Sequence, residues 1–283
     1  MILADIELAW RIDGFEARGS KAIGESAARR DPAARAFVIP AGRGYAVYSG
    51  PDSPANKVIG VGLDEDIEAG VLQEIEQAYF ARASAVQAEV ATLARPAVHA
   101  LFTQRGYVLQ GFEDVLGRLL THADALPAVE PGVRIDEVTD SDLATWIDVM
   151  ITGFENLDDS GAGSGVPLPP RQALEEAFGP SVEIPGFRAY LARLNEAAAG
   201  GAGLRAHEKI GQLCGATTLP AYRRRGIQTA LLRRRLCDAH RAGCDLAIMT
   251  AQPGSKSHFN ARRQGFELLY SRALLVKVPP AGQ

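Results

Sequence analysis

The sequence is poor in the residues that build metal centres and disulfide frameworks. Only three of its 283 residues are cysteines, Cys214, Cys237 and Cys244, and none of them forms a CxxC pair. The five histidines are scattered and form no HExxH motif. These absences argue against a zinc site and against a disulfide scaffold. We therefore expect no bound metal, and a protein of the reducing cytoplasm.

Long apolar runs and a strong net charge are also missing. No stretch approaches the roughly 20 apolar residues that a membrane span requires. The acids Asp5, Glu7 and Asp13 interrupt the N-terminal segment where a signal peptide would be apolar. The formal net charge is −4, which argues against nucleic acid as the main partner. We expect neither membrane nor nucleic-acid binding, and the oligomeric state stays open.

The composition is that of a soluble protein with more than one core. Hydrophobic residues make up 47% and charged residues 23% of the chain, which is ordinary for globular proteins, and the length fits two domains. Residues 122–131 have the composition of a linker, and residues 158–170 form a loop rich in Gly, Ser and Pro. We predict domains at 1–122 and 133–279, joined by a linker at 123–132.

The two halves share a pattern around a Gly-aromatic pair. Gly106 and Gly265 lie 159 residues apart (265 − 106), and each is followed by an aromatic residue and an apolar strand. Ala94 and Ala251, each two residues before a proline, lie 157 residues apart (251 − 94) and precede the corresponding helices. The agreement in order and spacing indicates an internal repeat.

The second half alternates between predicted strands and helices. Strands are expected at 133–138, 210–219 and 246–251, and helices at 140–154, 171–178, 186–194 and 227–242. The strand–helix–strand unit at 210–251 predicts two parallel strands with a right-handed crossover. The fold class is therefore predicted to be α/β.

The loop before the helix at 227–242 has the chemistry of an anion site. The first amides of a helix have no partner within the helix, and the helix dipole adds positive charge there. Gly226 allows the backbone to approach a ligand, and Arg223, Arg224 and Arg225 add charge beside it. A diphosphate suits such a site. The next arginines, Arg233–Arg235, are expected on a solvated face of the helix.

Residues 210–275 resemble the acetyl-CoA-binding half of GNAT-type N-acyltransferases. That family binds the CoA pyrophosphate with an R/Q-x-x-G-x-G/A loop, which Arg223 and Gly226 match and Gln228 does not. The resemblance implies two tandem GNAT-like domains, each a mixed, partly parallel sheet flanked by helices. It implies acetyl-CoA as co-substrate, and it extends the loop's binding role to Ile227, Gln228, Thr229 and Ala230.

The resemblance also assigns residues to the rest of the CoA molecule. The fourth strand of the family splays from its neighbour and pairs with the pantetheine arm, which by position falls on Ala216, Thr217 and Thr218. Asn260 lies where the family often contacts CoA. The first half has the acidic segment DEDIEAG where the loop is expected, so we predict no CoA site in residues 1–122.

The usual catalysts of the family are missing at their expected positions. The glutamate base position falls near Gln212 or Cys214, and the tyrosine acid position falls near Ala261. The base can instead come from the acidic segment 155–159, which begins with Glu155, or from solvent. Weak candidates for other catalytic roles are Cys214, His258 and Tyr270.

The sequence thus predicts a GNAT-type acyltransferase that moves an acetyl or other acyl group from CoA to the amine of a small molecule. The alternative is an acyl-CoA-binding regulatory or scaffolding protein without turnover. The acceptor and the acyl chain length have no recognisable motif.

Overall fold

The structure, a computed structural model, describes residues 4–125, 131–156 and 169–280. The loop expected at 158–170 and the middle of the expected linker lie mostly outside these residues. The chain folds into two units: the first consists of Met1–Leu116, Gly161–Pro180 and Thr250–Gln283, and the second of Gly117–Ser160 and Ser181–Met249. None of the described helices has the length and apolar composition needed to cross a membrane.

Among its described residues, the first unit contains six strands in the order β1-β2-β3-β4-β11-β5. The strands are β1 (Phe37–Ala41), β2 (Gly44–Tyr48), β3 (Lys57–Ile59), β4 (Val86–Ala91), β11 (Glu267–Lys277) and most of β5 (Val108–Leu119). Strands β3 and β4 are parallel, whereas β11 pairs with β4 in antiparallel fashion. The helices are α1 (Ile6–Arg30), α2 (Ala69–Phe80), α3 (Pro96–Gln104), α5 (Arg171–Ser181) and α7 (Lys256–Arg263).

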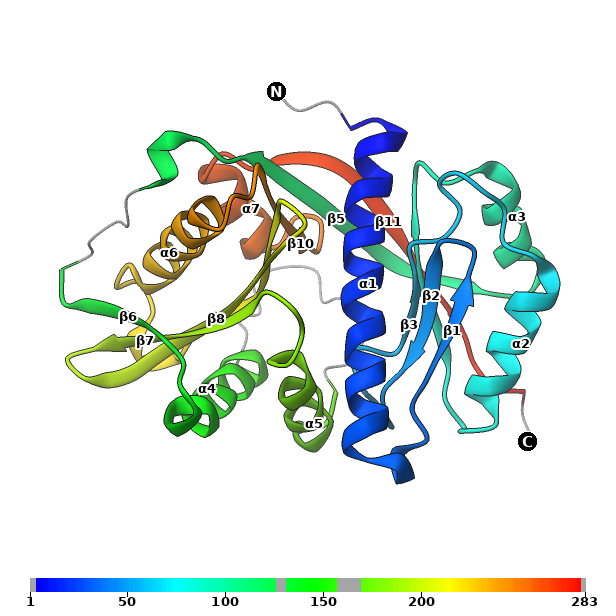
Figure 1. Ribbon diagram of the computed structural model, residues 1–283, viewed down its shortest axis with the longest axis horizontal. Helices are drawn as coiled ribbons and strands as arrows, with labels where there is room; N and C mark the ends of the chain where they lie inside the picture. Colours follow the sequence, from blue (N-terminus) through cyan, green and yellow to red (C-terminus); the bar gives the residue numbers. More distant parts are fainter. Residues whose placement is uncertain (1–3, 126–130, 157–168, 281–283) are drawn as a thin grey trace. The chain divides into compact units, whose positions relative to one another are not determined.

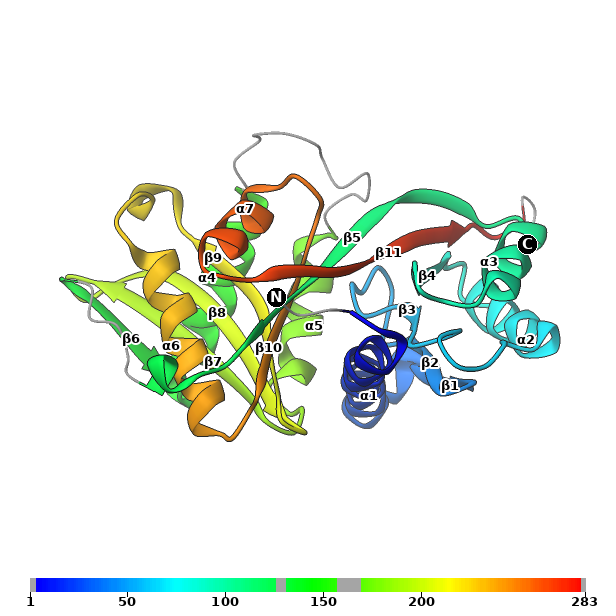
Figure 2. The ribbon, with the colours of Figure 1, turned by 90° about the horizontal axis from the view of Figure 1, so that it is seen from above.

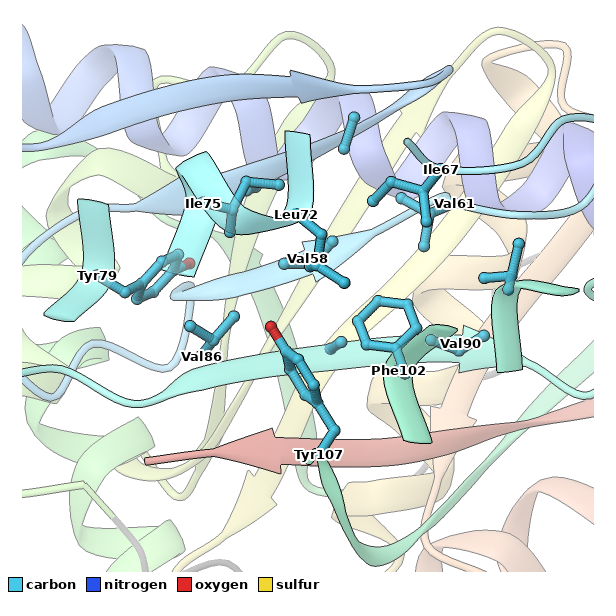
Figure 3. Close-up of a cluster of buried hydrophobic side chains, with 14 of the residues drawn as sticks. Val58, Val61, Ile67, Leu72, Ile75, Tyr79, Val86, Val90, Phe102 and Tyr107 are labelled. Atoms are coloured by element: carbon cyan, nitrogen blue, oxygen red, sulfur yellow. The ribbon is translucent and has the colours of Figure 1, made fainter. Parts of the chain in front are cut away.

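Helices cover both faces of this sheet because successive strand residues point in opposite directions. Helix α1, which is capped by Asp5, packs closely on β2: a Cβ at Gly24 would lie 2.8 Å from Val47. The next residue, Tyr48, points to the other face and joins the buried cluster under α2 and α3. Figure 3 shows Leu72, Ile75 and Tyr79 of α2 in this cluster, together with residues of β3 and β4.

The predicted repeat is visible where α3 and α7 end. Gly106 and Gly265 have φ angles of 81° and 82°. After α3, the amide of Gly106 donates to the carbonyl of Thr103, and the amide of Tyr107 donates to the carbonyl of Phe102. After α7, two bonds with the same sequence spacing are present: the amide of Gly265 donates to Arg262, and the amide of Phe266 donates to Ala261. The strands that follow, β5 and β11, are neighbours in the sheet (Figure 2). The repeated sequence pattern therefore encodes a repeated helix-to-strand turn.

A charged cluster is buried between α1 and the sheet of the first unit. Arg272 of β11 is 1% exposed, and its guanidinium pairs with Asp13 and Glu16 of α1. The hydroxyl of Tyr270 donates to Asp13 Oδ1 at 2.5 Å. Burial raises the pKa of Tyr270 well above its usual value, so this hydroxyl keeps its proton.

Two further carboxylates from the sheet complete this cluster. Arg272 Nη1 lies 3.7 Å from both Glu89 and Glu113, and Lys57 pairs with Glu89 at 2.6 Å. Burial and the neighbouring Glu89 raise the pKa of Glu113 to about 7, while Arg272 and Lys57 oppose this shift. The cluster therefore holds one carboxyl group that titrates near neutral pH.

In the second unit, the part that the structure describes contains five strands in the order β6-β7-β8-β9-β10. They are β6 (Val133–Glu137), β7 (Phe187–Leu194), β8 (Ala197–His207), β9 (Ile210–Thr218) and β10 (Leu246–Ala251). All neighbours are antiparallel except β9 and β10, which are parallel. Helices α4 (Leu143–Glu155) and α6 (Ile227–Arg241) cover opposite faces of β7 and β8 (Figure 1).

The predicted elements of this unit are confirmed with one exception. The helix expected at 186–194 is wrong, because this segment is strand β7, paired with β6 on one side and β8 on the other. Strand β8 was not expected at all. The parallel strand–helix–strand unit β9-α6-β10 is present as predicted.

Candidate functional site

Strands β9 and β10 pair over a short distance only. Their parallel ladder joins Ile210–Gln212 to Leu246–Ile248, and the described residues contain no further pair of these two strands. Strand β9 nevertheless continues to Thr218, paired with β8 on its other side. The segment from Leu213 to Thr218 therefore has one backbone edge without a β10 partner, and this segment includes Ala216, Thr217 and Thr218.

A bulge interrupts β9 at the start of this segment. Gly203 of β8 pairs with Cys214 and Ala202 with Ala216, so Gly215 is an extra residue. Gly215 has a φ of 41° and is exposed. A Cβ at this glycine would lie 3.2 Å from Met150 and 3.3 Å from Phe154. The bulge thus faces the C-terminal half of α4.

The loop after β9 leads into α6 through two left-handed residues. Arg224 has a φ of 61°, and Gly226, the N-cap of α6, has a φ of 77°. The first amide bonded within this helix is that of Ala230, which donates to the carbonyl of Gly226 at 2.9 Å. The amides of residues 227–229 therefore have no acceptor within the helix.

The residues of this loop differ in their exposure to solvent. Arg224, Arg225 and Gly226 are exposed, whereas Ile227 and Ala230 are 1% and 3% exposed and pack into the core. Arg223 is half-buried and donates to the carbonyl of Asn156, the residue after α4. The start of α6 is thus an exposed, positively charged edge anchored to the end of α4.

The chain is similar to known proteins in structure rather than in sequence. No family model matches the sequence, and no curated protein matches it significantly. A GCN5-related N-acetyltransferase from Kribbella flavida is 16% identical with a TM-score of 0.63, over 94% of this chain and 96% of that one. A tandem GNAT protein from the clavulanic acid biosynthesis pathway, solved without acetyl-CoA, is 14% identical with a TM-score of 0.60, over 92% and 89% of the two chains.

The chain has the tandem GNAT fold. A third solved structure, a GCN5-related N-acetyltransferase from Sphaerobacter thermophilus, is 16% identical with a TM-score of 0.55 and covers 75% of this chain and 68% of its own. These identities are low, so the likeness establishes the α/β fold with its partly parallel sheet.

Gln228, which departs from the GNAT loop pattern, does not extend its side chain over the exposed edge of the loop. The side chain of Gln228 is half-buried, and its Oε1 accepts a hydrogen bond from Thr218 Oγ1 at 3.3 Å. Gln228 therefore lies against the end of β9, and the neighbouring Thr229 is also half-buried. The start of α6 lies beside two exposed arginines, Arg224 and Arg225, and a helix N-terminus with positive charge beside it suits an anion such as a diphosphate.

The remaining candidates lie in both units. In the second unit, Cys214 stands at the bulge, where its thiol donates to the carbonyl of Gln212 at 3.5 Å, and Glu155 is exposed at the end of α4. In the first unit, Asn260 is exposed on α7, and Tyr270 is bonded to Asp13 as described above. No three metal-ligating side chains are grouped within residues 4–125, 131–156 and 169–280.

His258 has the most organised surroundings of the catalytic candidates. Its Nδ1 lies 3.1 Å from Asp114 Oδ2, and the other oxygen of that carboxylate accepts from Ser271 Oγ at 2.6 Å. The side chain of His258 is 17% exposed, whereas that of Asp114 is 6% exposed. Nδ1 is buried and makes no hydrogen bond among the described residues, so its contact with Asp114 is a close approach of the two side chains.

The acidic segment of the first half is occupied by ion pairs. Asp64 pairs with Arg43 at 2.8 Å, and Asp66 pairs with Arg95 at 3.2 Å. Arg43 and Arg95 therefore neutralise carboxylates of this segment. The corresponding loop of the second half has exposed arginines instead, so the acidic segment lacks the excess positive charge that a diphosphate needs.

Sequence reasoning missed Arg235. The prediction that Arg233–Arg235 lie on a solvated face is wrong for this residue, which is 3% exposed. A signal was present: Arg235 follows Ile227 and Leu231 at intervals of four, and both belong to the buried stripe of α6. The charge of Arg235 predicts an exposed side chain, but its position in the helical period predicts a buried one, and the side chain is buried.

Proposed function

We propose that the protein is an N-acyltransferase that moves an acetyl group from acetyl-CoA to the amine of a small-molecule acceptor. One observation carries this proposal: an exposed helix N-terminus, opened by left-handed Arg224 and Gly226, follows the segment of β9 that runs to Thr218 without a β10 partner among the described residues. A diphosphate suits the helix terminus, and an extended chain suits the free backbone edge of a strand.

The proposal assigns each part of acetyl-CoA to a part of the second unit. The amides of Ile227, Gln228 and Thr229 and the side chains of Arg223–Arg225 would hold the pyrophosphate, and Ala230 would complete the first turn of the helix behind them. The backbone of Ala216–Thr218 would pair with the pantetheine arm. This arrangement would bring the thioester towards Gly215 and Cys214, where β9 bulges.

Acyl transfer requires the acceptor amine in its neutral form, because a protonated amine has no lone pair for attack. Glu155 is our first candidate for the base, since the end of α4 is joined to the loop by the contact of Arg223 with Asn156. His258 is the candidate with a carboxylate partner. Solvent suffices as base if the acceptor amine has a low pKa.

The alternative, a non-catalytic acyl-CoA-binding protein, rests on the sequence alone. Gln212 and Cys214 stand near the position expected for the base, and Ala261 stands near the position expected for the acid. In either case we propose that the GNAT-like domain of residues 1–122 binds no CoA, and that residues 133–279 form the CoA-binding domain.

Calorimetric titration with acetyl-CoA tests the site. The wild-type protein is expected to bind, and Gly226→Trp, which places a large side chain over the amides of α6, is expected not to bind. Absence of binding by the wild type, or equal binding by the variant, would sink the proposal. Turnover is tested by following thiol release over a panel of small amines, and silence across the panel with intact binding would favour the non-catalytic function.

A further inference from the structure

Arg235 is a buried cation without an acidic partner. Its Nε donates to the carbonyl of Leu231 at 3.2 Å, and its Nη1 donates to the carbonyls of Gly203 at 3.1 Å and Gly215 at 3.3 Å. In the described part of the chain, no carboxylate pairs with its guanidinium. Buried charges in proteins are ordinarily paired with an opposite charge, so this arginine needs a reason beyond packing.

The two bonds from Nη1 hold the bulge of β9. Gly203 and Gly215 belong to β8 and β9, and they flank the point at which the register of these strands shifts. A peptide group is planar and trans, so its C=O and N–H point in opposite directions. By binding the carbonyl of Gly215 from the α6 side, Arg235 turns the N–H of Ala216 away from α6.

The charge of Arg235 persists at neutral pH although it is buried. Burial lowers the pKa of Arg235 to about 10, and the ionisable groups of Cys214 and Tyr190 oppose this shift. A group with this pKa is protonated near pH 7. Because little solvent reaches the guanidinium, its field is weakly screened. A positively charged guanidinium is therefore bonded to the bulge of β9, and no carboxylate of the described residues pairs with it.

We propose that Arg235 is a positioning residue for acyl transfer, which stabilises the negative charge that develops at the thioester. This inference rests on the proposed function. The amine nitrogen forms a bond to the carbonyl carbon, and the carbonyl oxygen takes up the negative charge. The C–S bond then breaks, its electron pair leaves on sulfur as the CoA thiolate, and the proton of the amine passes to a base or to water.

Arg235 donates no proton in this sequence. It acts through the Gly215 peptide, which it orients and polarises, and through its own positive charge. A preorganised charge of this kind favours the oxyanion and the thiolate over the neutral thioester. Because no acid stands at position 261, the thiolate has particular need of positive charge.

The test is a pH titration of the thiol of CoA bound to the full chain, followed by the ultraviolet absorbance of the thiolate. In the wild type the pKa of the bound thiol is expected to lie about one unit below that of free CoA, a tenfold effect. Arg235→Lys, which keeps the charge, is expected to retain most of this shift. Arg235→Gln, which keeps a donor without the charge, is expected to abolish it.

Turnover provides an independent measurement. Arg235→Gln is expected to lower kcat by roughly tenfold or more and to leave KM for acetyl-CoA nearly unchanged, and Arg235→Lys is expected to restore part of kcat. Arg234→Met is the control on the same helix: Arg234 binds Asp238 at 2.7 Å and the carbonyl of Ile135 at 2.9 Å. Its loss is expected to lower thermal stability without changing kcat.

The outcomes separate the two proposals. CoA binding by the wild type with an unshifted thiol pKa would overturn the role of Arg235 and leave the proposed function intact. This measurement needs no variant, so it decides even if Arg235→Gln does not fold. Equal loss of kcat in the Lys and Gln variants, together with a matching rise in KM, would show a purely structural residue. Failure of the wild type to bind CoA would overturn the proposed function and this role with it.

Discussion

Replacement of Gly226 by alanine tests the candidate site with a single methyl group. Gly226 caps α6 with a φ of 77°. This left-handed conformation costs a residue with a Cβ about 1–2 kcal/mol. Alanine also restricts the unfolded chain, which returns about 0.4–1 kcal/mol. The net destabilisation is therefore about 1 kcal/mol, which lowers the melting temperature of a protein of this size by roughly 2–4 °C.

The effect on acetyl-CoA should be much larger than the effect on stability. The new methyl group stands beside the amides of residues 227–229, which have no acceptor within α6. A hydrogen bond to a charged group contributes about 1.5–3 kcal/mol. Loss of one such bond to the pyrophosphate would therefore weaken binding by roughly 10- to 150-fold. Calorimetry and thermal melts of the same preparations measure the two effects.

Gly243 offers a matched control at the other end of the same helix. It has a φ of 80°, and no atom lies within 4 Å of the position that a Cβ would take. Gly243→Ala should therefore lose about the same stability by the same backbone strain, and it should bind acetyl-CoA normally. Equal affinity of the two variants would refute the assignment of the amides of α6 to the pyrophosphate.

Three other residues give predictions of different kinds. Gln228→Ala should keep the affinity for acetyl-CoA within about threefold in calorimetry, because the side chain binds Thr218 rather than the amides; a tenfold loss would show that it contacts the ligand. Arg272→Met should lower the free energy of unfolding by about 3–5 kcal/mol in denaturant titrations, because it leaves buried carboxylates uncompensated; a neutral effect would contradict this. The pKa of Glu113 is raised by burial from 4.5 to about 7, so the folded state binds the extra proton and its stability falls as pH rises through that window. Glu113→Gln should therefore be more stable than the wild type above about pH 7, by about 3 kcal/mol, and equal to it below about pH 4.5, and the opposite order would contradict the sign.

The parallel unit of the candidate site was predictable because its signals are local. Strand β9 ends two residues before Pro220, Gly226 opens α6, and the stripe of Ile227 and Leu231 has the helical period. Each of these signals lies within a few residues of the feature that it predicts. The loop and its arginines were found in the same way.

Strand β8 was missed because its stability is not local. Its glycines lower the strand propensity of the segment, but the fold needs them. A Cβ at Gly200 would lie 2.6 Å from the carbonyl of Thr217, and one at Gly201 would lie 2.9 Å from Met150 of α4. These close approaches join residues far apart in the sequence. No propensity read along the chain contains them.

Strand β7 was mistaken for a helix for a related reason. Its residues Ala189, Leu191 and Ala192 are good helix formers, and its inner residues are buried without a clear alternation. Pairing with β6 on one side and β8 on the other decides the matter. Tertiary pairing overrides intrinsic propensity in such a segment.

The alanine at the position expected for the acid and the buried Arg235 are connected by the chemistry of the leaving group. A departing thiolate is stabilised either by a proton from an acid or by positive charge held near it. Ala261 occupies the position expected for the acid and has no proton to give, whereas Arg235 introduces a positive charge into the buried stripe of α6. A buried charge without a partner lowers the stability of the folded protein. Arg235 is therefore costly as a structural residue, but its position beneath the bulge of β9 suits stabilisation of a thiolate that leaves without a proton.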